Sequence, residues 1–143
     1  MTTPDLAVFI DQYHRALDDF FRGDPESAKR LYSHREDVSL ANPFGPVVIG
    51  WEQVEETMER AAANYRDGGA SGFDTIATLV TAELAYFVEV ERFEARIGGE
   101  QQMASGALRV TSILRPEDGV WKIVHRHADP ITTSRSADSV IQR

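Results

Sequence analysis

The segment Trp121-Lys122-Ile123-Val124-His125-Arg126-His127-Ala128-Asp129 is the strongest local feature of the sequence. Successive side chains of a β-strand point to opposite faces, so strict alternation puts five of these residues on one face. That face runs from apolar to polar in the order Trp121, Ile123, His125, His127 and Asp129. Two imidazoles and a carboxylate can bind a metal, relay a proton or hydrogen-bond a ligand. They can also simply bond to neighbouring side chains and backbone at a strand end.

Three more extended runs lie upstream, at about Gly72 to Thr81, Leu84 to Ile97 and Gln102 to Leu114. Gly98-Gly99 and residues 117–119 supply turn residues between them. Together with the segment ending at Asp129, these runs predict an antiparallel β-meander. The apolar positions in the second run change from even to odd numbers near Glu91, which predicts a bulge there and a bent sheet.

Helical periodicity dominates the first half of the chain. Apolar residues recur at intervals of three and four from Pro4 to Arg22, with Thr3 as the expected cap, and again from Trp51 to Tyr65. Asp24 followed by Pro25 predicts a short helix between them. Residues 38–44 alternate as a strand that places Asn42 among apolar residues, before a turn at residues 43–46.

Helices followed by long antiparallel strands predict an α+β fold in which helices cover one face of the sheet. The length of 143 residues suits one domain, which we expect to span residues 1–131. Residues 132–143 are mostly small and polar, so we expect a mobile tail or an arm on a neighbouring subunit.

Composition narrows the classes of partner. The formal net charge of −8 argues against nucleic acid, and no apolar run is long enough to cross a membrane. The N-terminal residues lack the pattern of a signal peptide, so we expect a cytoplasmic protein. With no cysteine, thiolate chemistry and disulfides are excluded.

His125, His127 and Asp129 are the predicted catalytic residues, with either imidazole as acid or base and Asp129 orienting it. A tetrahedral metal site needs a further ligand, and no second histidine cluster or cysteine supplies one. We therefore expect neither a metal nor another cofactor.

Five residues are predicted to bind a ligand: Tyr13, Asn42, Phe44, Trp51 and Arg109. Asn42 can offer both a donor and an acceptor, or it can cap the turn that follows it. Tyr13 can aim its hydroxyl into a cavity or serve as plain core. Arg109 needs an anionic partner if it is buried, or it lies exposed on the outer sheet face.

A run of charged residues on the second long strand is interpreted as cross-strand ion pairs on the solvated or dimer-facing side, without chemistry. It comprises Glu89, Glu91, Arg92, Glu94 and Arg96.

The order of helices, the Asn42-Pro43-Phe44-Gly45 turn, the Gly50-Trp51 helix start and four strands ending in residues 121–130 resembles the SnoaL-like and ketosteroid-isomerase-like families. These belong to the nuclear transport factor 2-like superfamily, and the resemblance covers about Leu6 to Pro130. It implies a cone-shaped curved sheet, antiparallel or mixed, packed against three N-terminal helices around a pocket. It also implies a homodimer formed through the sheet.

Steroid isomerases of this superfamily use an aspartate base, a tyrosine on the first helix and a protonated aspartate. Tyr13 matches the tyrosine, but Asn42 stands at the base position and Arg109 falls near the second aspartate. An amide does not accept a proton in the useful range, so this activity is disfavoured.

The resemblance implies a pocket for a small, partly apolar molecule, because the superfamily includes isomerases, cyclases, dehydratases, hydrolases and binding domains. Whether this chain is an enzyme stays open at this point. The ending Trp121 to His127 also resembles stress and oligomerisation domains, so the alternative is a non-catalytic ligand-sensing or oligomerisation module.

Overall fold

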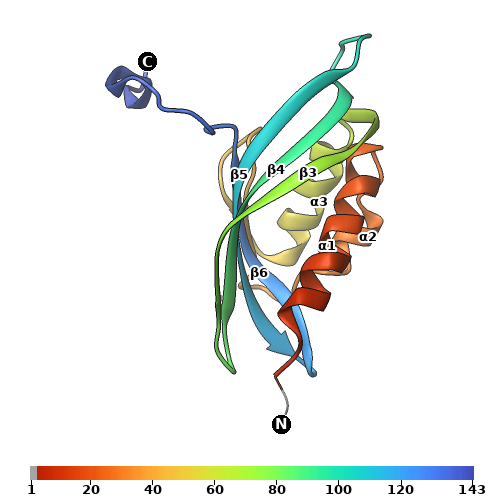
Figure 1. Ribbon diagram of the computed structural model, residues 1–143, viewed down its shortest axis with the longest axis vertical. Helices are drawn as coiled ribbons and strands as arrows, with labels where there is room; N and C mark the ends of the chain where they lie inside the picture. The colour runs from red at the N-terminus through yellow and green to blue at the C-terminus, as the bar shows by residue number, and fades with distance from the viewer. Residues whose placement is uncertain (1–2) are drawn as a thin grey trace.

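Three helices cover one face of a six-stranded mixed sheet (Figure 1). The computed structural model describes residues 3–143. Its helices are α1 (Leu6–Phe21), α2 (Glu26–Lys29) and α3 (Trp51–Ala62). The sheet has the order β2-β1-β6-β5-β4-β3 and stays open, which confirms the predicted α+β class. Its strands are β1 (Ser39–Ala41), β2 (Val48–Ile49), β3 (Tyr65–Val80), β4 (Ala85–Ile97), β5 (Ala104–Glu117) and β6 (Val120–Asp129).

Helix α1 packs its apolar stripe onto the sheet, as its periodicity predicted. Its N-cap differs from the expected Thr3, because Asp5 Oδ1 accepts hydrogen bonds from the backbone N–H groups of Ala7 and Val8. A carboxylate at this position satisfies two unpaired donors and opposes the helix dipole. Gly23, at a φ of 99°, follows the end of the helix.

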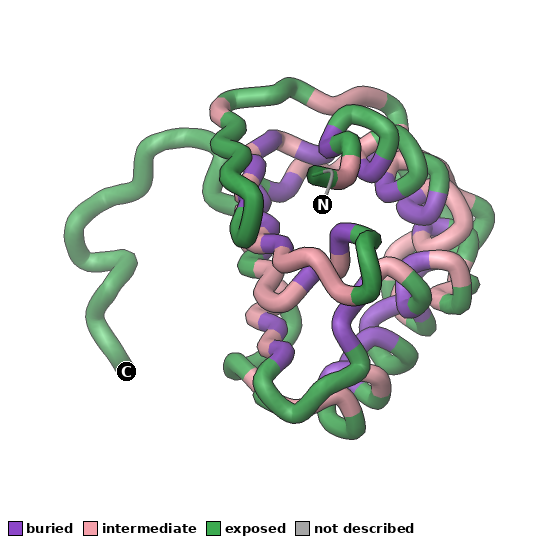
Figure 2. Tube along the Cα trace, turned by 90° about the horizontal axis from the view of Figure 1, so that it is seen from below, coloured by how far each residue is buried: buried purple, intermediate pink, exposed green. Residues whose placement is uncertain are grey.

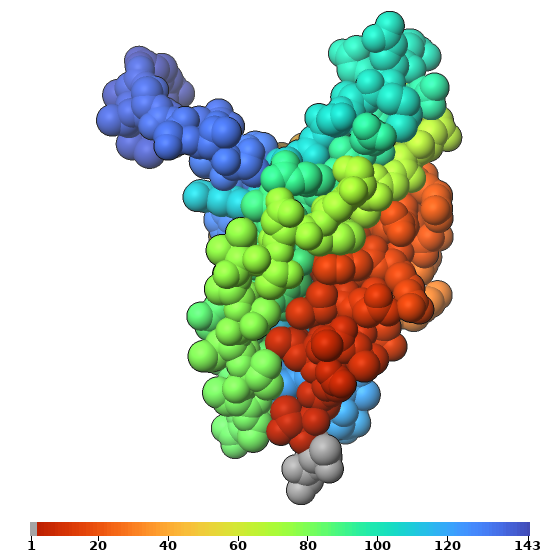
Figure 3. Space-filling view, in the orientation of Figure 1, coloured from red at the N-terminus to blue at the C-terminus, as the bar shows by residue number. Residues whose placement is uncertain are grey.

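Helix α3 ends at Ala62, three residues before the Tyr65 that the periodicity included, and Tyr65 already begins β3. Residues 67–69 are part of that long edge strand. Its pairing with β4 shifts register at three places, which lets it bend around α1. Space-filling Figure 3 shows α1 lying against this strand.

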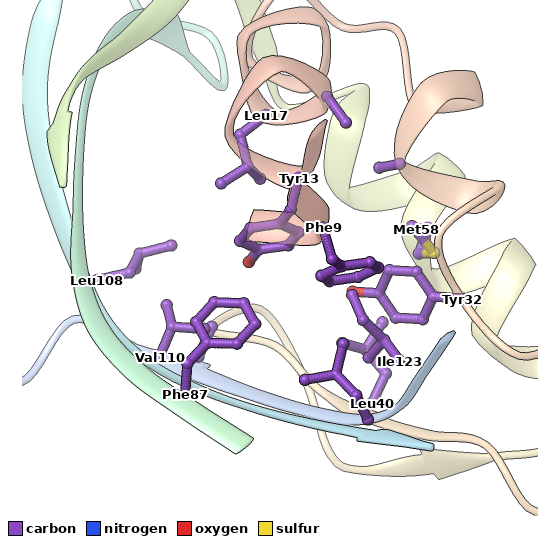
Figure 4. Packing of buried hydrophobic residues seen from close by; sticks show 14 of the residues in the cluster. Phe9, Tyr13, Leu17, Tyr32, Leu40, Met58, Phe87, Leu108, Val110 and Ile123 are labelled. Carbon is purple, nitrogen blue, oxygen red and sulfur yellow. The ribbon is translucent and has the colours of Figure 1, made fainter. Parts of the chain in front are cut away.

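Strand β6 is attached to the helical layer through its first half. The indole N–H of Trp121 donates to the carbonyl of Pro4 at 2.8 Å, just before α1. Backbone bonds also join Ile123 to Leu31 and Ser33, beyond α2. The core between the layers is built from aromatic and aliphatic side chains of both (Figure 4).

The predicted bulge near Glu91 is wrong. Strand β4 pairs with β5 without interruption from Ala85 to Ala95, so its odd-numbered residues face the helices throughout this stretch. A bulge occurs instead in β6, where Ile113 pairs with His125 and Leu114 pairs with Ile123, so Val124 is an extra residue. The inward face of β6 therefore changes from Trp121 and Ile123 to Arg126 and Ala128.

Beyond β6 the chain leaves the body of the molecule and ends in the short 3₁₀ helix η1 (Ala137–Val140) (Figures 1 and 3). The burial tube in Figure 2 shows this segment exposed along its length. Within residues 3–143, no helix combines the length and apolar character needed to cross a membrane.

Gly68 should be far less tolerant of a side chain than Gly72. A Cβ atom at Gly68 would lie 2.4 Å from the carbonyl oxygen of Glu94 and 2.7 Å from that of Phe21, both backbone atoms. We expect Gly68→Ala to lower the free energy of unfolding in urea by about 1–3 kcal/mol, the usual cost of overpacking. Gly72 has open space around it, so Gly72→Ala is the control; equal effects of the two variants would contradict this packing.

Candidate functional site

A small cavity lies between the helices and the sheet. Its volume is about 40 Å³, well below the several hundred Å³ typical of drug-sized ligand pockets. The walls are mostly apolar and come from α1, α2, α3 and four strands. They comprise Tyr13, Leu17, Phe20, Phe21, Ala28, Tyr32, Leu40, Asn42, Pro43, Phe44, Met58, Ala61, Tyr65, Leu108, Arg126 and Ala128.

One wall is polar because Tyr13 and Arg126 meet the buried carboxyl group of Glu91. The guanidinium of Arg126 donates to both carboxyl oxygens of Glu91, each at 3.0 Å. The hydroxyl of Tyr13 donates to Glu91 Oε2 at 2.5 Å and accepts from Arg126 Nη1. Figure 4 shows Tyr13 reaching from α1 toward Leu108 and Val110 of the sheet. Such a forked, charge-assisted pair is rigid as well as strong.

Burial governs the electrostatics of this group. Burial, together with the neighbouring Glu89 carboxylate, raises the pKa of Glu91 well above its usual range, while the two bonds from Arg126 favour the ionised form. Burial lowers the pKa of Arg126 to about 10, which leaves the guanidinium charged at neutral pH. A proton on Glu91 is therefore held more tightly than on an ordinary carboxyl group.

Two further tyrosines line the same cavity. Burial and the charge of Glu91 raise the pKa of Tyr65 to about 12 and also raise the pKa of Tyr32. Their phenol groups therefore stay protonated near neutral pH and are donors rather than anions. The lining of the cavity thus includes three tyrosines, Tyr13, Tyr32 and Tyr65, whose side chains can act as hydroxyl donors.

Asn42 and Phe44 lie at the mouth of the cavity, in the loop after β1. Asn42 Oδ1 accepts a hydrogen bond from the backbone N–H of Phe44, with 3.0 Å between the nitrogen and the oxygen. Asn42 therefore both caps its turn and lines the cavity. The ring of Phe44 is half exposed and lies 5.9 Å from the ring of Tyr65. A second hollow of about 140 Å³ begins on the other side of these two residues, next to Arg60 and Asn64.

The predicted catalytic residues lie on the opposite side of the sheet. The bulge at Val124 turns His125 and His127 away from the cavity. His125 Nδ1 is 2.7 Å from the hydroxyl of Ser39, and burial lowers its pKa. The side chain of His127 is 52% exposed and contacts Asp129 at 2.9 Å.

Arg109 also lies on that outer face, where its Nε donates to Asp129 at 2.7 Å. That bond lowers the pKa of Asp129 against the opposing effect of its burial. Trp51 begins α3 and stacks on His34 at 3.9 Å, beside an open hollow away from the cavity. The structure thus places Tyr13, Asn42 and Phe44 around one cavity and the other predicted residues elsewhere.

Sequence reasoning missed the roles of Glu91 and Arg126, and it placed Glu89 and Glu91 in the run of charged residues on the solvated or dimer-facing side of the sheet. That interpretation is wrong, because the exposed fractions of Glu89 and Glu91 are 1% and 0%. The signal was present in the parity of β4, where these two residues share a face with Phe87 and Phe93. The other residues of that charged run face solvent, including Arg92, which forms an exposed ion pair with Asp74.

The site can hold and move a proton. Tyr13 lines the cavity, and its hydroxyl donates a hydrogen bond to Glu91 and accepts one from Arg126, so it can exchange a proton with a bound oxygen atom. Arg126 places a positive charge where an oxyanion would form. Within residues 3–143, no three acidic or histidine side chains are grouped so as to hold a metal ion.

Replacing Glu91 by glutamine should leave the buried guanidinium of Arg126 without its counter-charge. We expect Glu91→Gln to lower the free energy of unfolding at neutral pH by about 3 kcal/mol or more. Asp74→Asn is the matched control, since it breaks an exposed pair on the neighbouring strand and should cost at most about 1 kcal/mol. A loss below 1 kcal/mol for Glu91→Gln, measured by urea unfolding, would show that this carboxyl group carries no charge in the native protein.

Three solved structures illustrate the similarity of the fold. A proposed dehydratase of the NTF2-like family from Streptomyces avermitilis superposes with a TM-score of 0.71 at 18% identity, over 90% of this chain and 95% of that one. A ketosteroid isomerase-like protein from Erwinia carotovora atroseptica superposes with a TM-score of 0.71 at 16% identity, over 90% of this chain and 95% of that one. A proposed calcium/calmodulin-dependent protein kinase type II association domain from Thiobacillus denitrificans superposes with a TM-score of 0.68 at 17% identity, over 91% of this chain and 98% of that one. At these identities the likeness shows the shared fold alone.

Comparison with curated protein sequences found no significant match. The model of the SnoaL-like domain matches residues 7–132, which is most of the chain and includes every helix and strand from α1 to β6 except the first residue of α1. The chain therefore belongs to the SnoaL-like domain family.

Proposed function

We propose that this protein binds a small, mostly apolar molecule that carries an oxygen acceptor, and that it moves a proton to or from that oxygen. The observation that carries the proposal is the hydroxyl of Tyr13, held between Glu91 and Arg126 at the wall of an apolar cavity. Arg126 is already paired with Glu91, so a neutral carbonyl suits the site better than a carboxylate.

In this mechanism Tyr13 is the group that touches the ligand. It donates its proton to the ligand oxygen as charge develops there, and Glu91, after taking up a proton, passes it to Tyr13. Arg126 stabilises the negative charge that passes along this path. An isomerisation, dehydration or cyclisation of a carbonyl compound requires this kind of step, which agrees with the similarity to a proposed dehydratase.

The outer-face residues His125, His127 and Asp129 remain a separate prediction for acid–base chemistry. They would serve a substrate bound on the open sheet face rather than in the cavity. Replacing His127 by glutamine is therefore an informative comparison, because it leaves the cavity unchanged.

A non-catalytic ligand-sensing or oligomerisation module is the second candidate. The observation that favours it is the cavity volume of about 40 Å³, which requires side chains such as Phe44 to move before a larger molecule fits. The shared fold with a proposed kinase association domain agrees with this candidate.

The binding proposal can be tested with acetophenone and ethylbenzene, which have similar shapes and differ by a carbonyl oxygen. We expect acetophenone to shift the methyl NMR signals of Leu108 and Ala128 and to bind about fivefold tighter than ethylbenzene, as one hydrogen bond of about 1 kcal/mol implies. Tyr13→Phe should abolish the difference, whereas Tyr86→Phe and His127→Gln, on the outer face, should preserve it. Equal affinities in the unaltered protein would contradict the proposed role of Tyr13.

The proposal includes a homodimer formed through the sheet. The even-numbered apolar residues Tyr86, Val88 and Val90 face outward from β4 and are partly exposed, and within residues 3–143 no helix covers them. Light scattering at micromolar concentration should give twice the chain mass of 16.0 kDa, and Val88→Glu should shift the protein toward the monomer. Val8→Glu, at an exposed position of α1, is the control. A monomeric unaltered protein would overturn the dimer.

A further inference from the structure

A second buried carboxyl group lies beside the first, and the proposed chemistry has not used it. Glu89 shares the inward face of β4 with Glu91, and its side chain is 1% exposed. One oxygen, Oε2, lies 2.8 Å from His14 Nε2. The other, Oε1, has no hydrogen-bond partner within residues 3–143, which is costly for a buried oxygen that has no further role.

His14 connects this carboxyl group to the surface. It follows Tyr13 in α1, and its side chain is 22% exposed, compared with 11% for Arg126 and 0% for Glu91. Its ring stacks on Phe73 of β3 at 3.5 Å and 5°, which holds it in a defined orientation toward Glu89. The imidazole is therefore fixed at one edge against a buried acid and is open to water elsewhere.

We infer that His14 and Glu89 relay protons between solvent and the buried Glu91–Tyr13 pair. This inference rests on the proposed function of Tyr13. When Tyr13 gives its proton to a bound oxygen, one proton moves from His14 to Glu89, from Glu89 to the neighbouring Glu91 and from Glu91 to Tyr13. His14 then takes up a proton from solvent, so one proton enters for each proton delivered.

Charge balance explains why an imidazole suits the surface end. If both carboxyl groups are ionised, Glu89 and Glu91 face one cation, Arg126, so a single proton shared among His14, Glu89 and Glu91 makes the cluster neutral. A net charge in this buried position would be costly. Imidazole is the side chain that gains and loses a proton most readily near neutral pH.

The relay can be tested in ligand-free protein by measuring how fast the hydroxyl proton of Tyr13 exchanges with water. Saturation transfer on protein labelled with ¹³C at the tyrosine ζ-carbon reports this rate. We expect His14→Gln, which keeps a hydrogen bond to Glu89 but cannot relay a proton, to slow exchange by about tenfold or more. His14→Phe, which keeps the stacking on Phe73, should do the same. In His14→Ala, added imidazole should restore the exchange rate.

His34→Gln is the matched control, because His34 also stacks on an aromatic ring and bonds to the backbone oxygen of Lys29 rather than to a carboxyl group. Unchanged exchange in folded His14→Gln or His14→Phe would overturn the relay and assign His14 a purely structural role. This result is independent of ligand binding. If acetophenone and ethylbenzene bind equally well, the proposed role of Tyr13 is rejected, but the exchange rate of the Tyr13 hydroxyl still tests the relay separately.

Discussion

The ion pair between Glu91 and Arg126, completed by the hydroxyl of Tyr13, is the constraint on which the rest of the structure depends. It joins β4, β6 and α1, three elements that lie far apart in the sequence. Because both charged groups are buried, each needs the other, and a small displacement of α1 or β6 would leave a charge unpaired. The same contacts that hold the layers together therefore fix the polar wall of the cavity.

The two faces of the sheet offer different chemistry. The inner face places a protonatable carboxyl group, a guanidinium and a phenol where water is largely excluded, and low polarity strengthens each interaction. The outer face carries His127, Asp129 and Arg109 in ion pairs exposed to solvent. Exposed pairs of this kind contribute little to the free energy of folding. This contrast is the reason the proposed proton transfer is assigned to the inner side. The family shares its scaffold among many functions, so this chain's function has to be argued from its own side chains.

Much of the architecture followed from simple patterns. The spacing of Leu6, Phe9 and Tyr13 predicted α1, and the glycine pair at 98–99 predicted the hairpin between β4 and β5. The place of Tyr13, Asn42 and Phe44 beside a cavity could be predicted because an aromatic residue on an inner helix face and a polar residue before a turn have local signals. Helix and strand ends were less predictable; for example, residues 65–69 join β3 because β4 offers partners that a local pattern does not reveal.

The sequence by itself determined the class of the fold, the order of its elements and the presence of a polar group on the first helix, since these depend on periodicity and turn residues. Only the tertiary structure decided which side chains of β4 and β6 face inward. A single extra residue at Val124 reverses the faces of β6 and replaces the histidines by Arg126. An isolated strand carries no mark of such a bulge, because the register depends on the partner strand. The burial of Glu91 likewise depends on Arg126, a partner 35 residues away that makes an otherwise unfavourable position stable.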